Sequence, residues 1–245
     1  MPLYNQYFDE SYNMQLIKFS IIPHRFYYTM YIIITAMIVY GFSQSVGRIV
    51  INSPYPNPPI LYIHMTVATC WLILTLVQAF LIQNRQVYLH RLVGICSLPL
   101  GFIIPIIGVP LTIIMTRLHM QEGYVVDDRE MIFPISDVVH FIFLYWLAIW
   151  WRRRPEIHKR LMLMTAITFT RAAFFRYPVS MYQEVWVLFG MDFLILIAAG
   201  RDLLVERRVN KVYLIGFPIM AAVQLLEHSV SCSHWWKIIA DEIVS

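Results

Sequence analysis

Long apolar runs separated by short polar segments dominate the hydrophobic pattern of this chain. A transmembrane helix needs about 20 mainly apolar residues to cross the hydrocarbon core of a bilayer. The pattern therefore predicts an all-α polytopic transmembrane bundle of about seven spans within residues 26–228. The predicted spans are Phe26–Gln44, Pro59–Gln83, Leu92–Met115, Pro134–Trp151, Leu161–Phe175, Met181–Gly200 and Val212–His228.

The polar flanks and loops predict how the chain is oriented. Residues 1–25 lack an apolar core followed by a small-residue cleavage site, so we expect a retained cytoplasmic or interfacial segment. Residues 229–245 form a short C-terminal tail. Basic residues gather in the second, fourth and sixth loops, the densest group being Arg152–Arg154. Because cytoplasmic loops carry more Lys and Arg, we expect the N-terminus inside a bacterial cytoplasmic (inner) membrane.

Composition agrees with this assignment and excludes other classes. Of the 245 residues, 59% are hydrophobic and only 14% are charged, which an ordinary soluble domain does not show. The formal net charge of +4 is explained by the basic loops, so we expect a lipid bilayer as partner and no nucleic acid. Three cysteines are too few for a disulfide framework.

Four histidines near the ends of the predicted spans form two pairs at matched depth. His64 and His140 lie near the outer surface, and His90 and His158 lie at the cytoplasmic starts of their spans. A histidine near a helix end can also bond to headgroups or carbonyls. Two imidazoles that face each other across a bundle are, however, what axial ligation of a b-type haem requires.

The first functional hypothesis is therefore transmembrane electron transport through haem b, with a quinol or a redox protein as partner. His64 with His140 and His90 with His158 are the expected axial ligands. Guanidinium groups bind carboxylates in a bidentate manner, so basic residues near these histidines are candidates for holding the haem propionates. The candidates are Arg91, Arg160 and Arg176.

Two further hypotheses stay open, and whether the protein is an enzyme is left undecided. One is a metal-dependent membrane hydrolase with zinc at the outer face, because zinc takes imidazole nitrogen and carboxylate oxygen. Its candidate ligands are His64, Asp137, His140 and His228, with Glu227 and His234 nearby. The other is a transporter or an assembly subunit. For it, Arg171 and Asp192 lie at similar depth and predict an intramembrane ion pair.

Three motifs support a resemblance over most of the chain. They are the segment from His90 to Gly94, the segment from Arg152 to Met162, and Asp202 followed by residues 208–216. Together they resemble an uncharacterised family of bacterial multi-pass membrane proteins. The resemblance implies a multi-pass topology and a bacterial origin, and no chemistry. The placement of the four histidines is similar, in architecture only, to the di-haem arrangement of cytochrome b561 proteins.

Overall fold

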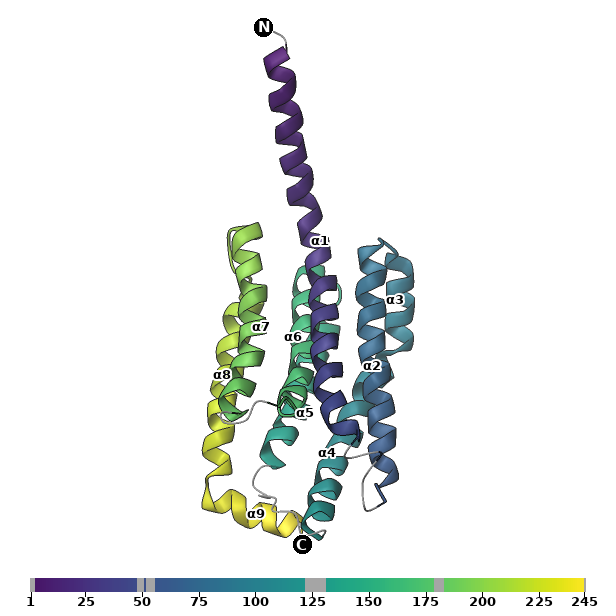
Figure 1. Cartoon of the computed structure of the whole chain (residues 1–245), viewed down its shortest axis with the longest axis vertical. Coiled ribbons are helices and arrows are strands. Elements are labelled where there is room, and N and C mark those ends of the chain that lie inside the picture. Colours follow the sequence, from purple (N-terminus) through teal and green to yellow (C-terminus); the bar gives the residue numbers. More distant parts are fainter. Residues whose placement is uncertain (1–2, 48–50, 52–55, 122–130, 179–182, 245) are drawn as a thin grey trace.

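The computed structural model describes residues 3–47, 51, 56–121, 131–178 and 183–244, and every regular element among them is a helix. The predicted all-α fold class is therefore confirmed. Most of the helices run side by side along the long axis (Figure 1). Their bounds are α1 Leu3–Val46, α2 Pro59–Gln83, α3 Val87–Cys96, α4 Leu98–Gln121, α5 Ile132–Trp150, α6 Pro155–Phe174, α7 Gln183–Glu206, α8 Lys211–Ser231 and α9 His234–Val244.

Five described segments are long and apolar enough to cross a membrane. They are Arg25–Val46 of α1, α2, the stretch Val87–Gln121 that joins α3 and α4, α5, and α8. Helices α6 and α7 lie among these segments (Figure 1), although they carry more ionisable side chains. The bundle is thus that of a polytopic membrane protein, and the count of seven spans stays a prediction.

Helix α6 is the most enclosed element of the bundle. It packs against α5, α1 and α7, and most of its side chains are buried. Helices α1 and α6 approach each other closely because small residues lie between them. A Cβ on Gly41 of α1 would collide with the backbone oxygen of Ala173 of α6. The hydroxyls of Thr165, Thr168 and Thr170 bond back to carbonyls of α6 itself. A polar helix can therefore lie inside the bundle without unpaired hydroxyls.

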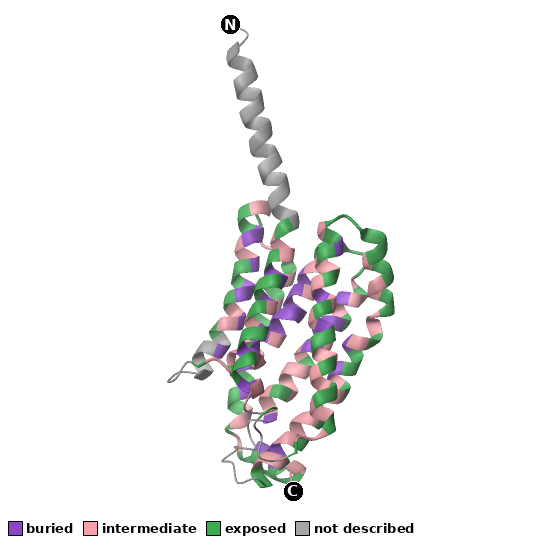
Figure 2. Cartoon of the chain, turned by 45° about the vertical axis from the view of Figure 1, so that its right-hand side comes forward, coloured by how far each residue is buried: buried purple, intermediate pink, exposed green. Residues whose placement is uncertain are grey.

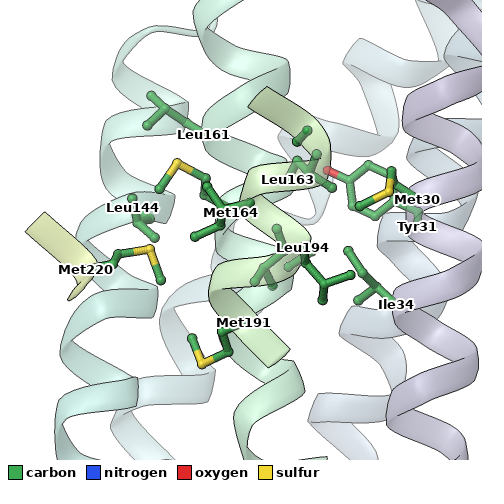
Figure 3. Close-up of a cluster of buried hydrophobic side chains, with 14 of the residues drawn as sticks. Met30, Tyr31, Ile34, Leu144, Leu161, Leu163, Met164, Met191, Leu194 and Met220 are labelled. Carbon is green, nitrogen blue, oxygen red and sulfur yellow. The ribbon is translucent and has the colours of Figure 1, made fainter. Parts of the chain in front are cut away.

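The apolar core surrounds α6 from several sides. Figure 2 shows buried residues concentrated inside the bundle and exposed residues along its outside. Figure 3 shows side chains from α1, α5, α6, α7 and α8 that meet in one cluster. Its labelled members are Met30, Tyr31, Ile34, Leu144, Leu161, Leu163, Met164, Met191, Leu194 and Met220.

The third predicted span is interrupted at Ser97, between α3 and α4. Pro99 lies in the first turn of α4, where its missing N–H would have no acceptor within the helix, so the new helix can start there. The hydroxyl of Ser97 donates to the carbonyl of Val93 at 2.6 Å, which satisfies a group at the end of α3. Helix α4 then continues through Pro105 and Pro110.

Both terminal segments are more regular than the sequence suggested. Helix α1 begins at Leu3, so the segment predicted at residues 1–25 is continuous with the first apolar span. The predicted C-terminal tail contains α9, which crosses one end of the bundle (Figure 1). Trp236 and Ala240 of α9 pack with Met131, and Nε of Arg117 donates to the carbonyl of Ile243 at 3.1 Å.

Candidate functional site

His90 and His158 lie together at the end of the bundle predicted to face the cytoplasm. Their ring centroids are 6.4 Å apart and the ring planes are nearly perpendicular, at 76°. His90 belongs to α3, which packs against α2 and α4, whereas His158 belongs to α6, which packs mainly against α5, α1 and α7. The two rings thus approach each other from helices that have different packing partners. The structure brings this predicted pair together.

Hydrogen bonds at Nδ1 orient both rings. Nδ1 of His158 lies 2.8 Å from the carbonyl oxygen of Ala148. A carbonyl only accepts, so Nδ1 carries the hydrogen and Nε2 keeps its lone pair. Nδ1 of His90 faces the side-chain amide of Gln78, which also lies against the amide nitrogen of Gly94. The orientation that satisfies both sides turns the NH2 of Gln78 to Nδ1 and the carbonyl oxygen of His90, while the Gln78 oxygen accepts from the Gly94 N–H at 3.0 Å, so Nδ1 of His90 accepts and its Nε2 carries the hydrogen.

Arg160 is occupied by an ion network, so its predicted role in binding a propionate is wrong. Its side chain is fully buried, and all its N–H groups already donate to protein oxygens. Asp202 accepts two of these bonds, at 2.7 and 2.9 Å, and Glu206 accepts one at 2.7 Å. The carbonyl and carboxylate of Glu156 accept the others, at 2.7 and 2.8 Å. Arg201 joins the same Asp202 and Glu206.

Glu156 is the exposed member of this network, before the start of the predicted fifth span. Partial burial raises the pKa of its carboxyl, but hydrogen bonds and charges from Lys159 and Arg160 outweigh that effect. The net result is a pKa below the ordinary value. Glu156 therefore stays ionised and holds the start of α6 to Arg160.

The other two arginines proposed for propionates differ in their surroundings. Arg91 is exposed and follows His90 directly, so it stays available for such a role. The guanidinium of Arg176 lies 4.3 Å from the ring centroid of Phe42, and it donates to the carbonyl of Ala172. These contacts hold Arg176 near α1, five residues beyond Arg171 on the chain and far along α6 from His158.

The predicted Arg171–Asp192 pair is not formed. Nη1 of Arg171 lies 3.1 Å from Oδ1 of Asp137, and Nη2 lies 2.7 Å from Oε2 of Glu227. Asp192 instead accepts a long hydrogen bond, 3.5 Å, from the amide of Gln224. Depth alone suggested the wrong partner, because the rotation of α6 turns Arg171 toward α5 and α8.

His140 lies beside this ion cluster. Its Nδ1 is 3.0 Å from the carbonyl oxygen of Ser136 and 3.9 Å from Oε1 of Glu227. The hydroxyl of Ser136 donates to the same Glu227 oxygen. Ser136, Asp137, His140, Arg171 and Glu227 form what we call the outer polar cluster, after the surface that the basic loops predict to lie outside.

His64 is not brought together with His140. Cε1 of His64 lies 3.7 Å from where a Cβ on Gly108 of α4 would stand, and Val138 of α5 contacts the same glycine. Val138 and His140 are two residues apart on α5, a rotation of about 200°, so they point to different sides. His140 faces α8 and His64 lies beside α4. Nδ1 of His64 is buried and has no hydrogen-bond partner among the described residues.

The zinc ligands proposed for the outer face do not assemble either. Asp137 and Glu227 are both held by Arg171, His64 lies elsewhere, and His228 is exposed. Within the described ranges, no group of three or more His, Cys, Asp or Glu side chains is placed to hold a metal ion. The hydrolase hypothesis stays a prediction.

Sequence reasoning missed the partners of Arg160. Asp202 and Glu206 are four residues apart and share one face of α7, and Glu156 precedes Arg160 by four on α6. This spacing of carboxylates around one arginine was the signal that could have predicted the network.

Comparisons with protein families, with curated proteins and with solved structures found no match to this chain. The resemblance to a bacterial membrane-protein family therefore stays a prediction, and the polar sites of the bundle carry the functional argument.

Proposed function

We propose that this protein is an integral membrane electron carrier that binds a b-type haem between His90 and His158. The observation that carries the proposal is the separation of 6.4 Å between the two ring centroids. Two imidazoles bound to opposite sides of one metal, through bonds of about 2 Å, place their ring centroids roughly 6 Å apart. The rings thus stand at the spacing that a shared axial position needs.

The surroundings of the two rings support the same proposal. Histidine ligands commonly donate their second N–H to a carbonyl or another acceptor, which fixes the ring and raises its basicity. Nδ1 of His158 does so to Ala148, whereas Nδ1 of His90 accepts from the NH2 of Gln78, which orients that ring from the other direction of hydrogen bonding. Gly94 lies one turn beyond His90, and the Gln78 amide packs against it, 3.7 Å from where a Cβ would stand. His158 thus has a free Nε2 lone pair, and His90 would have one once the Gln78 amide turned its oxygen to Nδ1, so a bis-histidine haem requires that rotation of Gln78.

Bound haem would supply one-electron redox chemistry, and the chain would supply position and environment. His90 and His158 would hold the haem iron, while Gln78 and Ala148 orient the rings. Arg91 is the arginine available for a propionate, because Arg160 is saturated. A quinol or a redox protein is the electron partner that we propose for a site near one membrane surface.

We further propose that α6 and α7 complete seven spans in a bacterial cytoplasmic membrane, with the N-terminus inside. The basic loop at Arg152–Arg154 supports this orientation. A reporter inserted in that loop should be active on the cytoplasmic side, and one fused after Ser245 on the periplasmic side. A cytoplasmic C-terminus would contradict the count.

The test of haem binding is the absorption spectrum of the purified full-length protein, produced with a haem precursor supplied. We expect a Soret band, and α-bands that appear on reduction. His90→Ala and His158→Ala should each abolish the bis-histidine spectrum. The matched control is His228→Ala, which removes an exposed histidine of α8 and should leave the spectrum unchanged.

Two results would contradict the proposal. One is a colourless protein that also fails to bind added haem. The other is a spectrum that survives both His90→Ala and His158→Ala, which would place the haem elsewhere. Gln78→Leu provides a graded test, because loss of an orienting partner lowers metal affinity by about 10- to 100-fold.

A further inference from the structure

Arg176 carries a positive charge that no carboxylate balances among the described residues. It stands two positions beyond the end of α6. Within the described part of the chain, its guanidinium makes a single hydrogen bond, from Nη1 to the carbonyl oxygen of Ala172. Nε is buried and has no hydrogen-bond partner there. A guanidinium does not lose its proton in a protein, so this charge must be balanced by an anion or by water.

The atoms without partners form one edge of the guanidinium. In Arg160, the edge formed by Nε and Nη2 donates to the carboxylate of Asp202 at 2.7 and 2.9 Å. In Arg117, the same edge donates to the carbonyl oxygen of Ile243. In Arg176, neither Nε nor Nη2 has an acceptor among the described residues. Such an edge is a fork that takes two oxygens of a carboxylate or a phosphate.

The segment that carries Arg176 is held in place by α1. The guanidinium lies 4.3 Å from the ring centroid of Phe42. The hydroxyl of Tyr177 donates to the carbonyl oxygen of Met37 at 2.9 Å, and the ring centroid of Tyr177 is 5.0 Å from that of Tyr40. The free edge therefore has a defined place before a ligand arrives, which lowers the entropy cost of binding.

The surroundings of Arg176 match the boundary between hydrocarbon and headgroups. Phe42 lies one turn before the end of the first segment that is long and apolar enough to cross a membrane. Ser43 and Gln44, which follow it, are polar and exposed, whereas Val39 is apolar and 58% exposed. A phospholipid offers a phosphate at this level and acyl chains on its hydrocarbon side.

We propose that Arg176 binds a phosphate group, and that a phospholipid of the outer leaflet supplies it. Nε and Nη2 donate to two phosphate oxygens, while Nη1 stays bonded to Ala172 and the ring of Phe42 supports the guanidinium. No covalent bond forms or breaks. The site lies at the opposite end of α6 from His158, so it stands whether or not haem is bound there.

The experiment is a lipid titration of the full-length protein in detergent, measured by native mass spectrometry. The probes are phosphatidylglycerol and monogalactosyldiacylglycerol, whose headgroup has no phosphate, and inorganic phosphate is added in excess as a competitor. We expect Arg176→Gln to bind phosphatidylglycerol about 10- to 100-fold more weakly than the wild type, the loss of hydrogen bonds to a charged group. The matched control is Arg117→Gln, which removes an arginine whose edge Ile243 already fills, and it should leave the affinity unchanged.

An unchanged affinity in Arg176→Gln would overturn the proposal, and so would equally tight binding of the lipid without phosphate. Displacement of phosphatidylglycerol by inorganic phosphate at similar concentration would overturn the assignment to a lipid. Phe42→Leu provides a second test if Arg176→Gln does not fold. It removes the ring that supports the guanidinium and should weaken binding about 2- to 5-fold, and no change would count against the site.

Discussion

The network around Arg160 permits a sharp prediction about stability. Arg160 and Asp202 are both fully buried, and Asp202 receives two hydrogen bonds from the guanidinium. Asp202→Ala leaves those two donors without partners in the interior of the bundle. Removing one partner of a buried ion pair destabilises a protein by about 3–5 kcal/mol. At about 1.4 kcal/mol for each factor of ten, the ratio of folded to unfolded protein falls by roughly a hundred- to several thousandfold.

The matched control changes another carboxylate bonded to the same guanidinium. The side chain of Glu156 is 64% exposed, and water can replace it when it is removed. Exposed ion pairs contribute about 0–1 kcal/mol, so Glu156→Gln should have a small effect. The two variants differ in burial while sharing Arg160 as partner, which isolates the contribution of desolvation.

The assay is the midpoint of unfolding by sodium dodecyl sulfate of protein reconstituted in mixed micelles, followed by helical circular dichroism. The double variant Arg160→Met with Asp202→Leu adds a decisive comparison. Replacing a buried ion pair by apolar side chains is often neutral or stabilising, so the double variant should exceed Asp202→Ala in stability. If Asp202→Ala and Glu156→Gln lost the same stability, the burial argument would be refuted.

Four further predictions concern packing and pH. Gly101→Ala should destabilise by about 1–3 kcal/mol in the same assay, because the new Cβ would stand 2.3 Å from the ring of Tyr145. Gly200→Ala meets open space and should be neutral or stabilising by roughly 0.5–1 kcal/mol. Trp71→Ala should lose about 3–5 kcal/mol, since Trp71 is 2% exposed and its ring lies 5.1 Å from that of Tyr145. The pKa of Glu156 is lowered, so its contribution is present above the ordinary value and is lost as pH falls through the lowered one. The unfolding midpoints of the wild type and Glu156→Gln should therefore converge in acid, and a gap that persists there would contradict this.

The positions of most helices could be predicted from the sequence because the length of each apolar run indicates a helix directly. In a chain of this composition, apolar runs of about 20 residues indicate helices that cross a membrane. The bounds of α2 agree with the predicted Pro59–Gln83. The pair of His90 and His158 also followed from depth, because both residues begin helices at one end of the bundle.

Side-chain partners were less predictable, because depth does not fix the rotation of a helix about its axis. The similar estimated depths of Arg171 and Asp192 suggested an ion pair. In the structure, Arg171 pairs with Asp137 and Glu227 instead. His64 and His140 share a depth and still face different neighbours. In each case the prediction was wrong about the direction in which a side chain points around its helix axis. That direction is determined by packing between helices that are distant in the sequence.

The enclosed position of α6 has a consequence for how the chain enters the membrane during synthesis. Arg160 and Arg171 lie near the two ends of α6, and both are buried among carboxylates. Ribosomes deliver α6 before α7 and α8, which hold Asp202 and Glu227. Arg160 and Arg171 therefore have Glu156 and Asp137 as partners early, and their ion networks are complete only once α7 and α8 have been made.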